Sequence, residues 1–251
     1  MRWAVYYGDA FSASDAQKLD LAVLEPDHIT PARFPNSKTK FYGYLSVGEV
    51  NPSRKYWPKL KDQDFVAGQN PIWKSYLMDI RSLKWQKILL DEIIPDILAK
   101  GYQGLFLDTI DTASKLEEKD PLKYAGSGEA MIGFIRSIKQ KFPHVLILAN
   151  NGLEMLPKTG DVIAGVVYEE LYLTYNFNTK KSEKTPPEDT AHNEAMLDRF
   201  KSQFHKPVFN IIYEASPETP LAKYAIERSK TKGYDWYLTT VDLMQMGTVS
   251  P

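Results

Sequence analysis

Residues 101–111 read GYQGLFLDTID, and this stretch decides the fold class. Its centre, residues 104–108, is a short apolar run typical of a fully buried strand, and it ends on the carboxylate Asp108. A segment with apolar residues at helical spacing precedes it at 82–99, and a second one follows at 128–141. A strand between two helices is the repeating unit of an α/β fold with a parallel sheet.

The same alternation runs along most of the chain. Further helices are expected at 191–204 and 220–231, and Ser127 is the expected N-cap of the helix at 128–141. The eight expected strands lie at 3–8, 21–26, 41–47, 104–108, 145–150, 163–169, 208–214 and 234–239. Eight evenly spaced strands favour a closed (β/α)₈ barrel of the TIM type, and a doubly wound sheet is the alternative.

Two segments depart from this alternation. Residues 73–80 are predicted to form either an extra strand or an extended loop before the helix at 82–99. Residues 178–190 are charged and longer than a usual connection, so we expect a mobile flap there. No change of composition marks a linker, and residues 1–251 are expected to fold as a single domain.

The composition excludes several classes of function. The chain has 31 basic and 32 acidic residues, so its net charge is −1. It therefore lacks the broad positive surface that would attract nucleic acids or anionic membranes. No apolar run approaches the roughly 18 residues of a membrane-spanning helix, so no membrane insertion is expected. There is no cysteine, and the histidines are too scattered for a metal site; we therefore expect neither metal nor cofactor. These histidines are His28, His144, His192 and His205.

Acidic residues and amides end several of the expected strands. In a barrel of this type the active site lies at the carboxyl ends of the strands, so these side chains should gather at one rim. Asp108 ends the fourth strand and Glu169 ends the sixth. Two such carboxylates suit glycoside hydrolysis, in which one attacks the sugar or activates water and the other protonates the leaving oxygen. The candidate substrate contacts are Tyr7, Asp9, Glu49, Asp79, Arg81, Asp111, Asn150, Glu170, Tyr172, Tyr213 and Trp236.

Each candidate also has an ordinary structural interpretation. Asp111 is either a functional group or the N-cap of the next helix, and Asp79 with Arg81 is either part of the site or a surface ion pair. Glu49 could simply satisfy backbone amides. Side chains alternate along a strand, so only one of the two adjacent glutamates of the sixth strand should face the barrel axis. The aromatic candidates equally fit packing.

Five segments, in order, carry a family resemblance. They are GYLSVGE (43–49), WKSYLMDIR (73–81), GYQGLFLDTID (101–111), LANNGLE (148–154) and VVYEELY (166–172). Together they resemble glycoside hydrolase family 114, the endo-α-1,4-polygalactosaminidases. The opening WAVYYGD (3–9) is more narrowly similar to the hydrolase domain of Pel-type exopolysaccharide proteins. The resemblance spans about residues 3–240.

The resemblance implies a (β/α)₈ barrel that cleaves α-1,4-linked galactosamine-rich polymers, including partly N-acetylated ones, internally and with retention of configuration. It makes Asp108 the nucleophile and Glu169 the general acid/base. The adjacent Glu170 is the alternative for the acid/base role. Retention requires the two carboxyl groups to lie about 5–5.5 Å apart, against about 6.5–9.5 Å for inversion. The other acids of the rim are expected to make a negative cleft that suits protonated amines.

Polymers of this kind are extracellular, so the resemblance implies a secreted, periplasmic or cell-surface protein. Met1 leads directly into an expected strand with no signal peptide before it, which fits either a cytosolic protein or a mature domain whose leader has been removed or omitted. With the resemblance, we expect the second. We expect a monomer. Two other functions stay open. A hydrolase of a different α-linked polysaccharide would have few acids beyond the catalytic pair, and a non-catalytic carbohydrate-binding barrel would have an occluded or widely separated pair.

Overall fold

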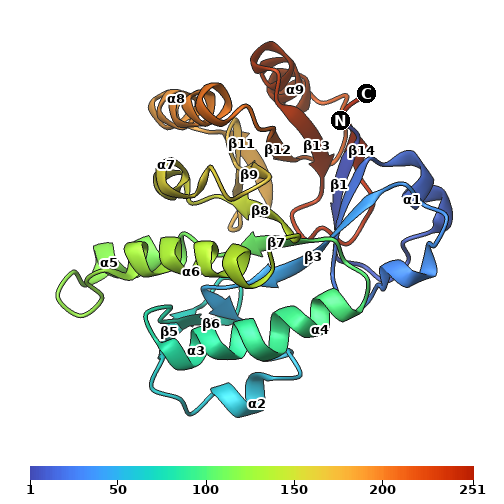
Figure 1. Ribbon diagram of the computed structural model, residues 1–251. Helices are drawn as coiled ribbons and strands as arrows, with labels where there is room; N and C mark the ends of the chain where they lie inside the picture. The colour runs from blue at the N-terminus through green and yellow to red at the C-terminus, as the bar shows by residue number, and fades with distance from the viewer.

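The computed structural model describes residues 1–251 and places eight parallel strands around a nearly closed barrel (Figure 1). These strands, in their order around the barrel, are β1 (Trp3–Tyr6), β2 (Leu21–Leu24), β3 (Lys40–Ser46), β7 (Gly104–Asp108), β8 (Leu146–Asn150), β9 (Gly165–Glu169), β12 (Val208–Tyr213) and β13 (Asp235–Thr239). Each of the eight expected strands is present, and the predicted (β/α)₈ barrel is confirmed. A short C-terminal strand, β14 (Thr248–Val249), pairs antiparallel with β13.

Helices cover the outside of the barrel (Figure 1). They are α1 (Ala13–Lys18), α2 (Trp57–Leu60), α3 (Leu83–Ile88), α4 (Ile94–Ala99), α5 (Thr112–Lys119), α6 (Ser127–Lys141), α7 (Leu156–Thr159), α8 (Pro187–Phe204) and α9 (Pro220–Lys232), with 3₁₀ turns at η1 (Pro31–Arg33) and η3 (Leu153–Met155). None of these helices combines the length and the apolar character that crossing a membrane requires.

The helix expected at 82–99 is present but has a wide turn in its middle. A π-helical turn, η2 (Leu89–Ile93), joins α3 to α4. Pro95 lies just after it, and a proline in a regular helix lacks the donor N–H and clashes with the carbonyl four residues earlier. The wider turn relieves that clash, so the helix stays continuous across the proline.

One expectation about the helices is wrong in detail. Ser127 is the first residue of α6 and not its cap, because the chain enters the helix through a left-handed Gly126. The carboxylate of Glu117 accepts the backbone N–H groups of Gly126 and Gly128 at 2.8 and 3.0 Å and so caps this helix from the preceding one. The Glu117 carboxylate thus caps the helix in place of the Ser127 hydroxyl.

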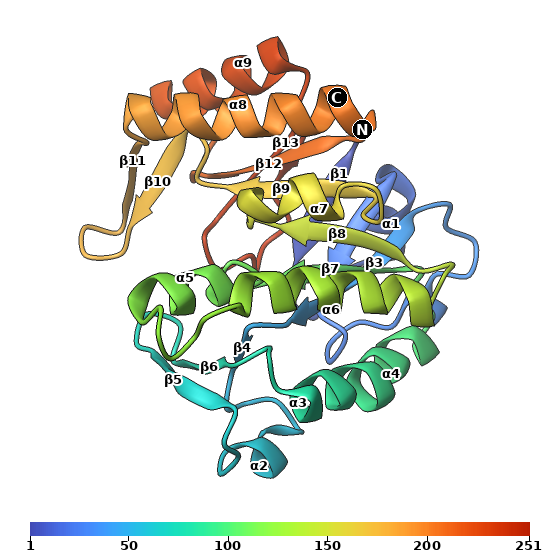
Figure 2. The ribbon, with the colours of Figure 1, turned by 60° about the vertical axis from the view of Figure 1, so that its left-hand side comes forward.

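The segment expected to be a flap, residues 178–190, is regular structure instead. It contains β11 (Lys181–Lys184), which pairs with β10 (Leu173–Asn176) in a hairpin, and it then continues into the first turn of α8. Residues 73–80 contain β6 (Ser75–Met78), the central strand of a small antiparallel sheet with β4 (Glu49–Val50) and β5 (Val66–Asn70). Figure 2 shows both additions at the end of the barrel where α5 begins.

Large aromatic side chains fill the barrel interior. Trp3 packs against Phe209 at 4.8 Å and against Tyr237 at 5.7 Å between ring centroids. Because side chains alternate along a strand, the residues two and four positions further on also point inward, toward the carboxyl ends of the strands. These aromatic side chains close the amino-terminal part of the barrel, so the polar side chains at the strand ends lie at its open carboxyl end.

Candidate active site

Asp108 and Glu169 meet at the side chain of Asn150. The three residues end β7, β9 and β8, and β8 pairs with both of the other strands. The Asn150 amide nitrogen donates to Asp108 Oδ1 at 2.8 Å and to Glu169 Oε1 at 3.1 Å. The two acceptor oxygens therefore lie within about 6 Å of each other, below the separation typical of inverting glycosidases. Asn150 is fully buried and its own Oδ1 has no partner, so the two carboxylates orient it.

Asp108 is surrounded by hydrogen-bond donors. Besides Asn150, the Tyr44 hydroxyl donates to Asp108 Oδ2 at 2.7 Å. Burial raises the pKa of Asp108, while the donors Asn150 and Tyr44 and the backbone of Thr109 pull that pKa back down. Hydrogen bonds to the charged form of a carboxylate favour that form. These donors favour the anionic form of Asp108 against the rise in pKa that burial causes.

Glu169 is placed to hold a proton. Burial raises its pKa to about 7, and the nearby charge of Asp108 adds to the rise. Asn151 donates to Glu169 Oε2 at 3.4 Å, and the Tyr213 hydroxyl also faces this carboxyl group. A carboxyl group with such a pKa is protonated in a large fraction of molecules at neutral pH, which general acid catalysis requires.

Three tyrosines form the wall beside the pair. Burial raises the pKa of Tyr7, Tyr44 and Tyr213 well above the usual value, and the carboxylates Asp108 and Glu169 contribute to the rise. The three hydroxyls are therefore neutral donors at any working pH. The ring of Tyr7 meets the ring of Tyr44 edge-on at 4.7 Å.

The chain turns sharply directly after each of the three central residues. Thr109, Asn151 and Glu170 follow Asp108, Asn150 and Glu169, and their φ angles are +58°, +59° and +56°. Left-handed conformations are unfavourable for side chains other than glycine, above all for a β-branched threonine. Such backbone strain is commonly found at functional sites.

Hydrogen bonds hold Thr109 in this conformation. Its hydroxyl accepts the backbone N–H of Gly48 at 2.9 Å, lies 2.8 Å from the Ser46 hydroxyl and reaches the carbonyl of Asp108 at 2.7 Å. These contacts tie the turn after β7 to the end of β3.

A pocket of about 400 Å³ opens beside Glu169, between α5, η3 and α8. Its charged lining is mainly acidic: the acidic side chains that line it are Asp111, Glu118, Glu154, Glu169 and Glu170. Lys115 is the cation of the pocket, and it is paired with Asp111 at 2.6 Å. The mouth therefore carries local negative charge, although the whole chain is nearly neutral.

Five of the predicted substrate contacts lie around the pair. Tyr7, Asn150 and Tyr213 surround the two carboxylates, and Asp111 and Glu170 line the acidic pocket. Glu170 accepts the backbone N–H of Tyr175 at 2.9 Å, and this contact fixes the hairpin that follows β9. Of the two adjacent glutamates, Glu169 is the one that faces Asn150 and Asp108.

The structure places three other acids and one arginine away from the pair. Asp9 is exposed on the loop after β1. Glu49 is buried and accepts hydrogen bonds from Asn70, Ser75 and Thr112, so it anchors the β4–β6–β5 sheet. Asp79 and Arg81 form an ion pair at 2.6 Å, and the Arg81 guanidinium also donates to the carbonyl of Ala125 at 3.1 Å.

Two predicted aromatic contacts also lie elsewhere. Tyr172 is buried near α9, with the Arg228 guanidinium 5.6 Å above its ring. Trp236 is buried next to Tyr237, and because Tyr237 packs inside the barrel, alternation turns Trp236 toward the helical layer. Both are packing residues in this structure.

Sequence reasoning missed Tyr44, Asn151 and Lys115 as members of the site. Tyr44 and Asn151 lie inside two of the segments that carry the family resemblance, GYLSVGE and LANNGLE, so the resemblance could have indicated them as site residues. Lys115 lies on α5, one helical turn after Asp111, and no pattern in the sequence distinguishes it from other surface lysines. No group of three or more histidine or acidic side chains is arranged to hold a metal ion.

A barrel with two carboxyl groups held by one amide at its mouth, one of them with its pKa raised to about 7, has the arrangement of a glycoside hydrolase. The chain belongs to glycoside-hydrolase family GH114, whose sequence profile matches residues 1–250. The family resemblance of the sequence is thus confirmed.

Solved structures share the fold. The glycoside hydrolase domain of PelA from Pseudomonas aeruginosa superimposes with a TM-score of 0.86 at 24% identity, over 98% of this chain and 97% of that one. Ega3 of Aspergillus fumigatus, in complex with galactosamine, gives 0.78 at 16% identity, over 99% and 94%. An uncharacterized protein of Thermotoga maritima is 21% identical over 51% of this chain, and the match covers 43% of that relative.

Proposed function

We propose that this glycoside hydrolase cleaves α-1,4-linked, galactosamine-rich polysaccharide internally and with retention of configuration. The observation that carries the proposal is the Asn150 amide shared by Asp108 and Glu169 at 2.8 and 3.1 Å. One chain supplies all of these groups, as a monomeric enzyme requires. Because polymers of this kind are extracellular, we place the activity outside the cytoplasm or at the cell surface.

The two carboxyl groups have separate roles in this mechanism. The Asp108 anion attacks the anomeric carbon while Glu169 gives its proton to the leaving glycosidic oxygen, which forms a glycosyl ester on Asp108. Glu169, now ionised, takes a proton from water, whose oxygen attacks the anomeric carbon and releases Asp108. The short separation supports this double displacement, because a water molecule between the groups needs a wider gap.

The acidic pocket supports an amine-bearing substrate. Glu118, Glu154 and Glu170 line it beyond the catalytic pair, and protonated amines at C2 of a galactosamine polymer would be attracted to this surface. Ega3, which shares the fold, was crystallised with galactosamine. The acids of the pocket argue against a hydrolase of a neutral α-glucan, because such a substrate carries no positive charge. The raised pKa of Glu169 argues against a non-catalytic barrel, because sugar binding alone does not require a protonated carboxyl group.

The test is digestion of a partly deacetylated α-1,4-galactosaminogalactan, with the products read by mass spectrometry. Wild type should release oligosaccharides, whereas Asp108→Asn and Glu169→Gln should lose at least about 10³-fold in rate. Glu218→Gln, which removes an exposed carboxylate outside the pocket, is the matched control and should keep the wild-type activity. Glu170→Gln removes one acid of the pocket and should weaken binding of the polymer without abolishing hydrolysis. Loss of activity in Glu170→Gln together with an active Glu169→Gln would move the acid/base by one residue. No products from wild type would refute the proposed substrate.

A further inference from the structure

Arg54 lies in the loop after β4 and makes a two-point ion pair with Glu25, at the end of β2. The two guanidinium nitrogens Nη1 and Nη2 lie 2.6 and 2.7 Å from Glu25 Oε1 and Oε2, and Nη1 also reaches Asp27 at 3.0 Å. Glu25 is only 6% exposed. This geometry fixes the plane of the guanidinium, because both ends of the fork are bound.

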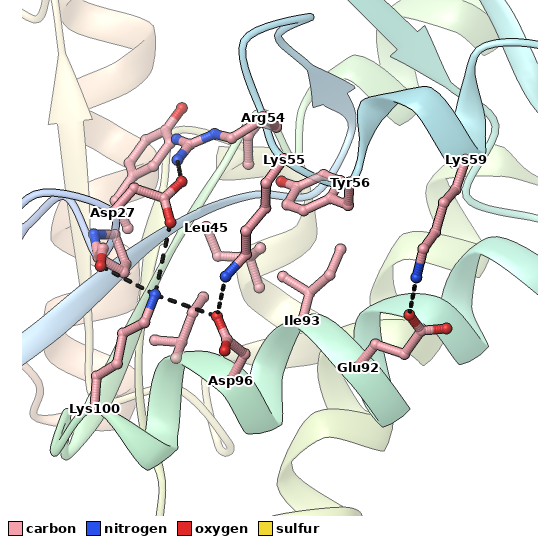
Figure 3. A pocket seen from close by; sticks show the side chains of 14 residues that line it. Asp27, Leu45, Arg54, Lys55, Tyr56, Lys59, Glu92, Ile93, Asp96 and Lys100 are labelled. Carbon is pink, nitrogen blue, oxygen red and sulfur yellow. Dashed lines mark hydrogen bonds and ion pairs between the residues drawn. The ribbon is translucent and has the colours of Figure 1, made fainter.

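Figure 3 shows Arg54 and Asp27 in the wall of a pocket of about 370 Å³ beside α4. The other cations of this pocket are already paired: Lys55 with Asp96, Lys59 with Glu92, and Lys100 with Asp96. None of these lysines is therefore unpaired. Arg54 differs from these lysines because it also contacts a residue of the catalytic wall.

That residue is Tyr44. The Arg54 guanidinium lies over its ring, with Cζ 5.5 Å from the ring centroid, and the ring of Tyr7 meets it at 4.7 Å. The hydroxyl at the far end of the same ring donates to Asp108 at 2.7 Å. A chain of direct contacts thus runs from Glu25 through Arg54 and Tyr44 to Asp108.

A cation above a phenol ring has two effects. It holds the ring in place through cation–π attraction, and it draws electron density from the hydroxyl, which makes the hydroxyl a stronger donor. The charge of Arg54 accordingly lowers the pKa of Tyr44, against the large rise caused by burial. A stronger donor stabilises the anionic form of the carboxylate that accepts from it.

We propose that Arg54 is a positioning residue for Asp108, held by Glu25 and acting through the ring of Tyr44. This inference rests on the proposed function in one respect, since it treats Asp108 as the nucleophile. Removing Arg54 should loosen Tyr44, weaken its hydrogen bond and raise the pKa of Asp108. If the Arg54–Glu25 pair only fastened the loop to β2, its removal would lower stability and leave that pKa unchanged.

Other groups also face Asp108, and the experiment has to keep them constant. They are Tyr7, Tyr213, Glu169, Asp111 and Lys115. None of them is altered in the variants below, so a change in the pKa of Asp108 reports on Arg54 and Tyr44.

The test is a double-mutant cycle of Arg54→Met and Tyr44→Phe. The pKa of Asp108 is read by ¹³C NMR of its carboxyl carbon, assigned by its absence in Asp108→Asn. We expect each single variant to raise this pKa by about one unit, a tenfold change in proton affinity, and Arg54→Met to add little in the Tyr44→Phe background. The double variant Glu25→Gln/Arg54→Met removes both charges of the pair and should show the same rise without leaving Glu25 as an unpaired buried carboxylate; Asp27 keeps Lys100 at 3.6 Å.

Arg136→Met is the matched control, because Arg136 makes a similar two-point pair with Asp161 at 2.7 and 2.9 Å on the surface. It should leave the pKa of Asp108 unchanged. The inference is overturned if Arg54→Met does not move that pKa, or moves it equally with and without the Tyr44 hydroxyl. The titration needs no substrate, so an inactive wild type would refute the proposed function and still leave this inference decided by the NMR result.

Discussion

At the scale of single residues, the site depends on a proton held by Glu169. Its pKa is raised by burial, from 4.5 to about 7, so the folded protein binds this proton more tightly than the unfolded chain does. Unfolding then releases a proton between these two pH values, and stability falls as the pH rises through this window. Glu169 thus makes the folded state less stable at alkaline pH, because its carboxyl group has to ionise at a partly desolvated position.

Glu169→Gln should therefore stabilise the protein at pH 8 and have little effect near pH 4.5. The expected gain at pH 8 is at most on the order of 3 kcal/mol in the free energy of unfolding. Urea unfolding of both proteins at the two pH values measures it. Glu218→Gln, which removes a surface carboxylate, controls for the change in net charge. A gain of equal size at both pH values would show that Glu169 carries no raised pKa.

The strained Thr109 gives a second prediction at this scale. Thr109→Val keeps the branched shape and the left-handed conformation but removes the hydroxyl that binds Gly48 N–H, so about 1–3 kcal/mol of stability should be lost. The control is Thr231→Val on α9, whose exposed hydroxyl donates to the Glu227 carbonyl at 2.9 Å; its cost should be much smaller. Equal losses in thermal unfolding would mean that the Thr109 hydroxyl does not support the turn.

At the scale of elements, two hairpins meet beside the barrel mouth. Trp73, in the turn between β5 and β6, is 50% exposed and contacts the 41% exposed Phe177 of the β10–β11 turn at 5.2 Å between ring centroids. The first hairpin follows β3 and the second follows β9, which ends in Glu169. Exposed rings next to the proposed polysaccharide site suit the apolar faces of sugars.

We expect Trp73→Ala and Phe177→Ala each to raise KM for the polymer about tenfold and to leave hydrolysis of a short oligosaccharide nearly unchanged. Steady-state kinetics on both substrates gives the answer. Leu122→Ala is a matched control, because this apolar side chain is 95% exposed in the loop between α5 and α6. If the polymer and the oligosaccharide were affected equally, the rings would not be distal contacts.

The elements that sequence could predict are those with apolar periodicity. The eight barrel strands are largely buried and mostly apolar, whereas β11 reads Lys-Ser-Glu-Lys, lies mostly exposed and has no apolar face to detect. The carboxylates at the ends of β7 and β9 could be found because an acid after an apolar run is unusual. Trp236 was wrongly predicted to contact substrate, because the sequence alone does not show whether Trp236 or its neighbour Tyr237 faces the inside of the barrel.

The contacts that complete the site depend on neighbouring strands. Asn150 could be named from sequence as a strand-end amide, but its place between two carboxylates depends on β8 lying between β7 and β9. Glu49 looked like a rim acid, and only the pairing of β4 with β6 brings Ser75 and Asn70 to its carboxylate. The left-handed Thr109 gives no sequence signal, since threonine rarely adopts that conformation.

At the scale of the whole molecule, the barrel closes at a seam between its first and last strands. One continuous hydrophobic core runs through it from Trp3 to Leu243. At the seam, Ser250 donates from its backbone to the Trp236 carbonyl at 3.1 Å and from its hydroxyl to the Met1 carbonyl at 2.8 Å. The two ends of the chain therefore lie together, as Figure 1 shows.

Truncation after Gly247 removes β14 and these contacts. The loss of a few hydrogen bonds at about 1 kcal/mol each should lower Tm by roughly 5–10 °C in a domain of this size. Removal of Pro251 alone is the control and should have no comparable effect. An unchanged Tm after the longer truncation, measured by calorimetry, would mean that β14 does not contribute to barrel closure.

We propose that Asp108 acts as the nucleophile and Glu169 as the general acid/base. The most direct test is ¹H NMR of the anomeric protons during the first minutes of polymer hydrolysis by wild type, before mutarotation. The close carboxyl groups predict that the new reducing ends appear first as the α anomer, the configuration of the cleaved bond. Reducing ends that appear first as the β anomer would show inversion and contradict the assignment of Asp108 as nucleophile.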